Sequence, residues 1–153
     1  MAGDASTPTY RDPSQPVERR VEDLLARMTL AEKVEQLHGL QRAPIDDLYH
    51  TPPNERLGIP GYRMVDGPRG VRAGKTTAFP VGMARGATFD PELERRVGAA
   101  MGLETGARGG NVLLAPCINL LRHPSWGRAQ ETYGEDPHHL GVMGAAFVEG
   151  VQQ

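Results

Sequence analysis

The first third of the chain has apolar residues at helical spacing. A helix predicted over residues 17–28 has its apolar side chains on one face: Val21, Leu24, Leu25 and Met28. Thr29 followed by Glu32 has the form of a capping box, in which each side chain bonds the other residue's backbone N–H. This pair predicts a second helix, which we expect to stop near Gly39 because glycine favours the position after a helix end.

Two later runs have the character of strands. Residues 62–65 form a short candidate strand, and residues 111–115 form a continuous apolar run that is typical of a buried parallel strand. The segments 41–60 (with a proline at Pro44), 67–89 and 117–135 are predicted to be loops, and residues 1–15 a mobile tail. With so few strands, we expect the chain to be a portion of a larger fold.

Two Asp-Pro pairs mark the starts of further helices. Asp90-Pro91 and Asp136-Pro137 each combine an N-cap carboxylate with proline at the first helical position. The first of these helices is predicted to run to about residue 108 and to end at Gly109, and the second to continue to the end of the chain. Strands that alternate with helices predict an α/β fold with parallel βαβ units.

Composition narrows the function classes. The chain of 153 residues has a net charge of −2, which argues against a nucleic-acid partner because phosphate binding needs a basic face. No apolar run is long enough to cross a membrane, and the first residues lack the layout of a secretory signal. A single cysteine, Cys117, fits a reducing compartment, so we expect a cytoplasmic protein. Without a Cys/His cluster or a phosphate-binding loop, no metal or other cofactor is expected.

Candidate functional residues follow the two predicted strands, because parallel α/β folds place their sites at the carboxyl ends of strands. Asp66 could accept hydrogen bonds from two neighbouring sugar hydroxyls, or could simply form an Asp-Gly-Pro turn. Arg72 and Arg128 could donate to hydroxyls and hold Asp66 ionised, or could form structural salt bridges, such as Arg128 with Glu131. Residue types and spacing alone favour the structural alternatives.

Other polar residues near these loops have simpler explanations. The acidic group Glu131, Glu135 and Asp136 could suggest paired carboxylates for glycoside chemistry, but Asp136 is better explained as a helix cap and Glu131 as a counterion of Arg128. His138 and His139 diverge on a helix and cannot chelate one metal. His123 could lie at a pocket rim, although a loop histidine is more often solvated, and Trp126 could stack on a sugar face or merely cover the loop.

Two motifs, in the same order and register, resemble those of glycoside hydrolase family 3. Residues 64–72 (MVDGPRGVR) resemble the D-G-P-x-G-x-R segment of that family. Residues 114–119 and 127–137 (GRAQETYGEDP) are similar to its second signature, and residues 79–80, 87–90 and 28–33 also match. The resemblance spans about residues 17–153.

The resemblance implies that residues 16–153 are the N-terminal portion of a (β/α)8 TIM-type barrel. It implies retaining hydrolysis of terminal β-linked glycosides, as in a bacterial β-glucosidase, with Asp66, Arg72 and Arg128 binding the sugar next to the cleaved bond. The family's nucleophile and acid/base belong to the rest of the barrel and to a second domain, so no catalytic residue and no activity of this chain alone are expected. The alternatives are a non-catalytic carbohydrate-binding fragment and, less favoured, a nucleotide-binding α/β domain.

Overall fold

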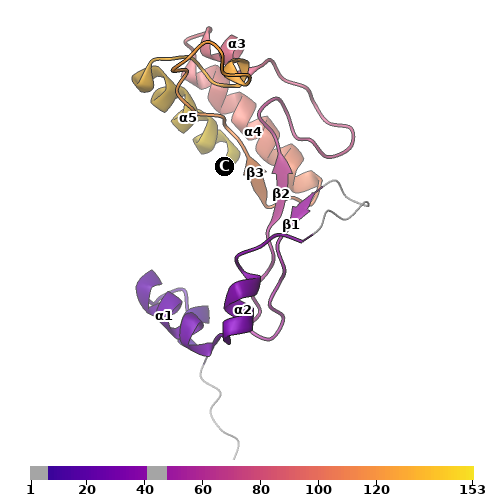
Figure 1. Ribbon diagram of the computed structural model, residues 1–153, viewed down its shortest axis with the longest axis vertical. Helices are drawn as coiled ribbons and strands as arrows, with labels where there is room; N and C mark the ends of the chain where they lie inside the picture. The colour runs from indigo at the N-terminus through magenta and orange to yellow at the C-terminus, as the bar shows by residue number, and fades with distance from the viewer. Residues whose placement is uncertain (1–6, 41–47) are drawn as a thin grey trace, which may run out of the picture. The chain divides into compact units, whose positions relative to one another are not determined.

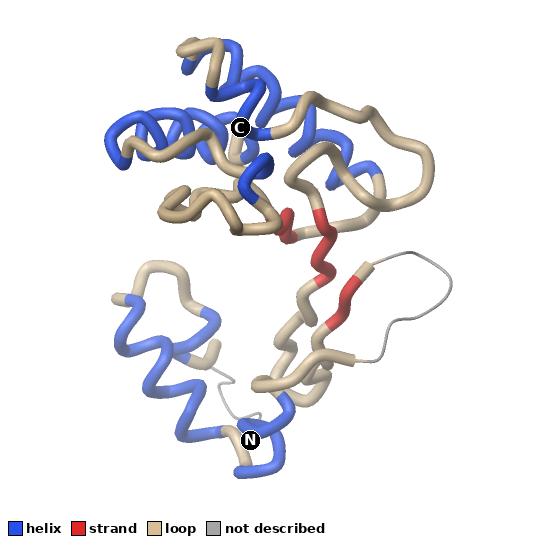
Figure 2. Tube along the Cα trace, turned by 45° about the horizontal axis from the view of Figure 1, so that its top comes forward, coloured by secondary structure: helices blue, strands red, loops and turns tan. Residues whose placement is uncertain are grey.

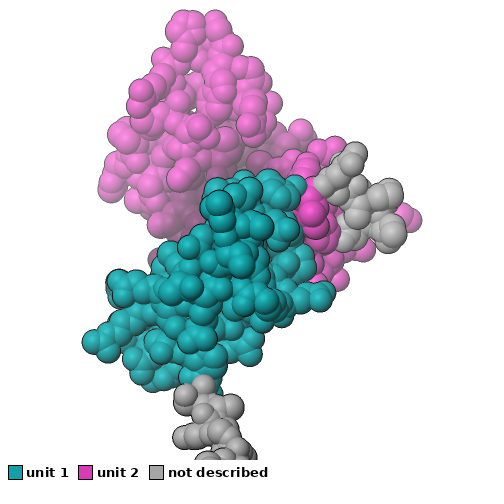
Figure 3. All heavy atoms as spheres, turned by 60° about the horizontal axis from the view of Figure 1, so that its bottom comes forward, with its two compact units in different colours: residues 1–39, 51–61 teal, residues 40–50, 62–153 magenta. Residues whose placement is uncertain are grey.

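The computed structural model of the protein describes residues 7–40 and 48–153 (Figure 1). The chain forms two compact units, the first made of residues 1–39 with 51–61 and the second of residues 40–50 with 62–153 (Figure 3). Pro44, part of the expected loop at 41–60, and residues 1–6 of the expected tail lie outside the described residues.

The first unit begins with a short 3-10 helix, η1 (Thr9–Arg11), which lies within the segment expected to be a tail. The backbone N–H of Tyr10 donates to Asp23 Oδ2 over 3.0 Å, and its hydroxyl donates to the carbonyl oxygen of Leu57 over 2.8 Å. These bonds join residues 9–11 to the following helix, α1 (Val17–Arg27), and to the 51–61 segment.

The predicted capping box opens the second helix, α2 (Leu30–Glu35). Thr29 Oγ1 accepts from the N–H of Glu32 at 3.3 Å, and Glu32 Oε2 accepts from the N–H of Thr29 at 2.8 Å. The prediction of the cap is confirmed, but the helix ends at Glu35 rather than near Gly39. The N–H of Leu37 bonds to the carbonyl of Val34, so the chain leaves the α-helical ladder in a tighter turn.

The second unit contains a three-stranded sheet in the order β1-β2-β3. β2 (Arg63–Asp66) and β3 (Val112–Leu114) are parallel, with Val65 opposite Leu113, which confirms the predicted βαβ arrangement. β1 (Tyr49–His50) pairs antiparallel with β2 and corrects the expectation of a loop there. Two residues are too few to show the alternation by which a strand is recognised in a sequence.

Three helices accompany this sheet: α3 (Gly82–Gly86), α4 (Pro91–Ala107) and α5 (Pro137–Val151). Asp90 Oδ1 caps α4 by accepting from the N–H of Leu93 at 3.0 Å, and Asp136 Oδ1 caps α5 by accepting from the N–H of His139 at 2.7 Å. Both predicted caps are confirmed. The helix α3 was expected to be loop, and its glycine-rich sequence explains why local propensity does not reveal it.

Helices α4 and α5 pack side by side (Figures 1 and 2). Glycine at Gly98 and Gly150 makes the close approach possible, because a β-carbon would lie 2.3 Å from Phe147 O in the first case and 2.0 Å from Arg95 O in the second. Buried apolar side chains from the sheet, the first loop and both helices form one core: Leu48, Val65, Val71, Ala73, Val97, Met101 and Phe147. Among the described residues, no helix has the length and apolar character needed to span a membrane.

Candidate functional site

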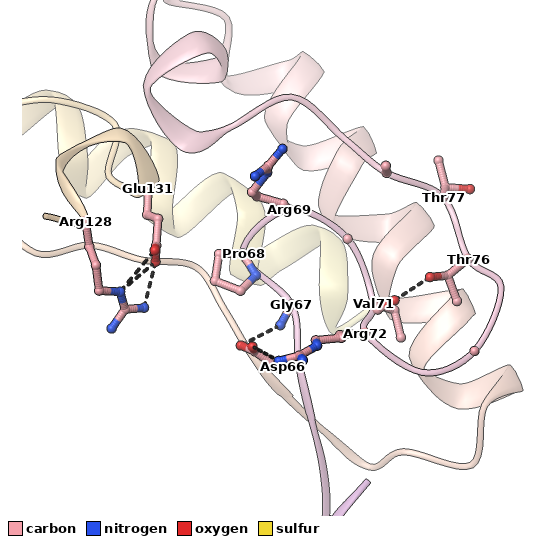
Figure 4. A pocket seen from close by; sticks show the side chains of 13 residues that line it. Asp66, Gly67, Pro68, Arg69, Val71, Arg72, Thr76, Thr77, Arg128 and Glu131 are labelled. Atoms are coloured by element: carbon pink, nitrogen blue, oxygen red, sulfur yellow. Dashed lines mark hydrogen bonds and ion pairs between the residues drawn. The ribbon is translucent and has the colours of Figure 1, made fainter. Parts of the chain in front are cut away.

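A cavity of about 470 Å³ lies at the carboxyl ends of β2 and β3 (Figure 4). It is lined by residues of two loops: Asp66, Gly67, Pro68, Arg69, Gly70, Val71, Arg72, Gly74, Thr76, Thr77, Ala78, Arg128 and Glu131. The structure therefore brings together, around one cavity, all three residues that the sequence singled out: Asp66, Arg72 and Arg128.

The position of Asp66 follows from the way in which side chains alternate between the two faces of β2. Val65 points into the core and is fully buried, so the next side chain, Asp66, emerges at the strand end with 41% of its surface exposed. Its Oδ1 accepts from the N–H of Gly67 at 3.1 Å, and its Oδ2 lies 3.8 Å from Nη1 of Arg72. A carboxylate has about four lone-pair positions, so these contacts leave Asp66 able to accept bonds from a ligand.

Arg72 is the more exposed partner of this pair, with 68% of its side chain accessible. Its backbone N–H donates to the carbonyl of Asp66 over 2.8 Å, which closes the turn between the two residues. An ion pair of 3.8 Å at the surface contributes little to stability. The guanidinium is thus held near the cavity without being committed to a strong internal bond.

Two glycines of the first loop are required because neighbouring atoms lie too close to allow a side chain. A β-carbon at Gly67 would lie 2.2 Å from Leu113 Cδ1 on β3. Gly70 has a φ of +124°, which favours glycine, and a β-carbon there would lie 2.2 Å from the carbonyl oxygen of Thr77. The N–H of Gly70 donates to the carbonyl of Gly67 over 3.3 Å, so the segment after Asp66 is a turn, as the structural alternative predicted, and it also borders the cavity.

Glu104 of α4 holds the far wall of the cavity. Its carboxylate accepts from the N–H of Thr77 at 3.2 Å and from the Thr77 hydroxyl at 2.6 Å. The Thr76 hydroxyl donates to the carbonyl of Val71, and the N–H of Phe79 donates to the carbonyl of Arg69 over 2.8 Å. The glycine-rich segment thus has a defined shape, held in part from a helix.

Arg128 lies in the second loop, directly before the short 3-10 helix η2 (Ala129–Glu131). Its side chain forms a two-point ion pair with Glu131, the last residue of that helix (Figure 4). Its Nε lies 3.0 Å from both carboxylate oxygens, and its Nη2 lies 2.6 Å from Oε2. The predicted counterion role of Glu131 is confirmed. The hydrogen bonds to Glu131 raise the pKa of Arg128, with a smaller contribution from the charge of Asp66, and the same bonds lower the pKa of Glu131.

The other sequence candidates lie elsewhere. The His139 ring packs on Phe89, with 4.6 Å between ring centroids, and its Nε2 lies 3.0 Å from the carbonyl oxygen of Gly86. His123 Nδ1 accepts from the N–H of Ser125 at 3.1 Å. Neither histidine lines the cavity, nor do Trp126 and Glu135. Within residues 7–40 and 48–153, no cluster of three or more His, Cys, Asp or Glu side chains is arranged to hold a metal ion.

The sequence analysis did not identify a buried charged cluster that contacts Pro68, a residue of the cavity lining. Arg85 of α3 and Glu94 of α4 are only 4% and 1% exposed, with Arg85 Nε 3.6 Å from Glu94 Oε2. The Tyr133 hydroxyl donates to Glu94 Oε1 over 2.5 Å. A detectable signal existed in α4: Glu94 lies three residues before Val97 and seven before Met101, so a charged residue occupies the apolar face of the helix.

Burial governs the protonation of this cluster. It raises the pKa of Glu94, although the hydrogen bond from Tyr133 and the charge of Arg85 act in the opposite direction. Burial, followed by the bond to Glu94, also raises the pKa of Tyr133. The Arg85 guanidinium stacks over the rings of Tyr133 and Phe147, at 5.8 and 5.6 Å from their centroids.

Comparison with known proteins identifies the class to which this fold and cavity belong. The chain is a member of glycosyl hydrolase family 3, since the model of the family's N-terminal domain matches residues 18–153. The expected fold, the N-terminal portion of a TIM-type barrel, is confirmed by structural neighbours from the same family.

The individual relatives are β-glucosidases. A β-glucosidase of Rhizobium radiobacter is 41% identical over 139 residues, which are 86% of this chain and 16% of that protein. The structure of β-glucosidase 3B from Thermotoga neapolitana, in complex with α-D-glucose, superposes with a TM-score of 0.80 at 37% identity, over 87% of this chain and 21% of that one. The glucose complex of the Kluyveromyces marxianus β-glucosidase gives 0.76 at 35% identity, over 86% and 16%. The chain thus spans about a sixth to a fifth of the length of these relatives.

Proposed function

We propose that the cavity at the ends of β2 and β3 binds the terminal sugar of a β-linked glycoside, and that the whole protein is a retaining β-glucosidase. One observation carries the proposal: Asp66, Arg72 and Arg128, from two separate loops, line a single cavity. Its volume of about 470 Å³ falls within the range of small-molecule sites, roughly 300–1,000 Å³.

The chemistry of the three side chains suits a pyranose. The Asp66 carboxylate can accept from two adjacent hydroxyls, and charge-assisted bonds of this kind are short and directional. The guanidinium groups of Arg72 and Arg128 can donate to hydroxyl oxygens from the other sides of the ring. Contacts to sugar hydroxyls contribute to catalysis when they strengthen in the oxocarbenium-like transition state.

The carboxylates of this cavity do not form a catalytic pair. Retaining glycosidases need one carboxyl group as nucleophile and a second as acid/base. Glu131 is bound to Arg128 in a two-point ion pair, and its lowered pKa makes it a poor proton donor. We propose that the nucleophile and the acid/base come from the rest of the barrel and from a second domain, and that this chain supplies sugar binding.

The ligands of the structural neighbours support glucose as the sugar. The Thermotoga neapolitana and Kluyveromyces marxianus enzymes were solved with glucose, and both superpose on this chain over most of its length. The proposed substrate class is therefore the terminal β-D-glucosides.

The test is hydrolysis of 4-nitrophenyl β-D-glucopyranoside by the complete gene product and its Asp66→Asn variant. Asparagine keeps the shape but removes the charge and one acceptor oxygen, so kcat/KM should fall by roughly 100-fold, equivalent to about 3 kcal/mol. The matched control is Asp90→Asn, because asparagine caps helix α4 as well as aspartate does. An unchanged kcat/KM for Asp66→Asn would exclude the proposed site.

Sugar binding without hydrolysis is the second candidate for the 153-residue chain taken by itself. It is favoured by the lining of the cavity, because one of its two carboxylates, Glu131, is engaged in the ion pair with Arg128. Titration of the isolated chain with D-glucose, followed by NMR, distinguishes the cases alongside the hydrolysis assay. Binding with no turnover supports the second candidate. Turnover by the pure chain contradicts it, and also contradicts the proposal that the nucleophile and the acid/base lie outside this chain.

A further inference from the structure

We infer that Arg85 is a positioning residue of the proposed sugar site, and that it fixes the loop of Asp66 relative to the loop of Arg128. The inference rests on the proposed function and extends it to a side chain that does not line the cavity. It begins from the place of α3, which contacts the backbone of the second loop and reaches the turn of the first.

Helix α3 packs directly on the backbone of the second loop. A β-carbon at Gly82 would lie 2.0 Å from the carbonyl oxygen of Glu131, and one at Gly86 would lie 2.3 Å from that of Tyr133. The Thr132 side chain between them is fully buried and donates to the carbonyl of Asn119 over 2.6 Å. The backbone around Glu131, the counterion of Arg128, is therefore in fixed contact with α3.

Arg85 connects the same helix to the first loop. Its Nη2 donates to the carbonyl oxygen of Pro68 over 3.1 Å, in the turn that follows Asp66. The guanidinium is also paired with Glu94, which accepts from Tyr133. A continuous series of contacts thus runs from the turn after Asp66, through Arg85 and Glu94, to Tyr133 in the second loop.

This arrangement is poorly suited to stabilising the fold. Nε and Nη1 of Arg85 and Oε2 of Glu94 are buried without a hydrogen-bond partner among the described residues. Buried ion pairs with incomplete hydrogen bonding often contribute nothing to stability compared with apolar packing, and their better attested role is to specify one geometry. The geometry specified here is the separation of two loops.

Loss of that geometry should lower kcat/KM more than it lowers the stability of the fold. Pro68 lies two residues from Asp66, so a shift of its carbonyl moves the carboxylate that is proposed to grip the sugar. Misplacement of a binding group by about 1 Å can reduce a rate by roughly 100-fold. The expected result is a loss of kcat/KM that exceeds the loss of ground-state glucose binding.

The experiment compares Arg85→Met and Arg85→Lys with the wild type in the complete gene product, at a temperature well below each Tm. Met fills the space of the side chain without donating to Pro68, and Lys keeps the charge beside Glu94 but lacks the fork that serves both partners. We expect kcat/KM on 4-nitrophenyl β-D-glucopyranoside to fall at least tenfold in Arg85→Met and at least threefold in Arg85→Lys. The inhibition constant of D-glucose should rise less.

The control is Arg95→Met, which makes the same substitution on α4 but removes only the surface ion pair with Glu92. A lower Tm with unchanged kcat/KM in Arg85→Met overturns the inference, because the cluster is then merely structural. If Arg85→Met does not fold, Arg85→Lys decides: unchanged kinetics in the folded Lys variant also overturn it. Failure of the proposed function is recognised separately, by an Asp66→Asn variant that retains full activity.

Discussion

The hydroxyl of Tyr133 donates to Glu94 Oε1 over 2.5 Å, across 39 positions of the sequence. Tyr133 belongs to the loop that carries Arg128, whereas Glu94 belongs to the buried face of α4. The bond therefore attaches a loop of the proposed sugar site to the main helix of the second unit. Its partners are buried, so water cannot replace either of them when one is removed.

Tyr133→Phe tests the strength of this attachment. The substitution keeps the ring over Arg85 and removes only the donor, which leaves Glu94 Oε1 buried without its partner. The free energy of unfolding should fall by about 1–3 kcal/mol, the usual cost of an unsatisfied buried group. Urea unfolding measures it, and a change below about 0.5 kcal/mol would mean that the carboxylate finds another donor.

The pH dependence of stability should report the buried carboxyl group of Glu94. Burial raises its pKa above the ordinary value of 4.5, while Arg85 and Tyr133, which face it, limit the rise. A raised pKa in the folded state gives a stability contribution that is complete below about pH 4.5 and is lost as the pH rises through the folded pKa. Glu94→Gln does not titrate, so its Tm relative to the wild type should increase between pH 4 and pH 7.

A pH-independent difference in Tm between Glu94→Gln and the wild type would contradict this account. Glu92→Gln is the matched control on the same helix, since Glu92 is exposed and the ion pair with Arg95 lowers its pKa. The stability that Glu92 contributes depends on pH in the opposite direction, because it is present above the unfolded pKa and is lost as the pH falls through the folded pKa. The two variants should therefore diverge from the wild type in opposite senses.

Glu131→Gln separates the orientation of Arg128 from its charge. The two-point ion pair holds the guanidinium, 64% exposed, in one direction beside the cavity. Glutamine retains one acceptor, so Arg128 stays charged but turns more freely, and kcat/KM should fall by roughly two- to fivefold, the range of an exposed pair. The glucoside assay measures it, with Glu149→Gln on α5 as the control, and a gain in kcat/KM would show that Glu131 restrains rather than orients Arg128.

Gly70→Ala tests whether the first loop must keep its shape. The φ of +124° and the carbonyl of Thr77, 2.2 Å from a built β-carbon, both oppose a side chain at this position. Strain of this kind is on the order of 1–3 kcal/mol, and the loop should shift from Asp66, with at least a tenfold loss of kcat/KM. The control is Gly106→Ala, where a β-carbon meets no atom within 4 Å and alanine favours the helix. Equal behaviour of the two variants would contradict the prediction.

Local signals in the sequence predicted much of the scaffold. The N-caps Asp90 and Asp136 and the capping box of Thr29 and Glu32 act over three residues, so they can be recognised without tertiary information. Asp66 could be selected because a strand followed by a charged turn places that side chain at the carboxyl end of a parallel sheet. Its proposed sugar-binding role depended on the family motifs, since spacing alone favoured a turn.

The features that were missed depend on distant contacts. Helix α3 has glycine at both ends and forms where the second loop packs against it, which no local pattern reveals. Arg85 lies in a segment that was expected to be a loop, whereas it belongs to a helix and is buried beside Glu94. The partner of a buried charge is chosen by the fold, so its identity could not be predicted from either residue alone.

The close packing of Gly82 and Gly86 on the second loop has a consequence for how this site can vary. The distance between α3 and the second loop is limited by close backbone packing at these glycines, which have no side chain that could be shortened. A methyl group at Gly82 must push the backbone of Glu131 outward, and with it the anchor of Arg128. The width of the proposed sugar site can thus be altered by substitutions on α3 that leave every residue lining the cavity unchanged.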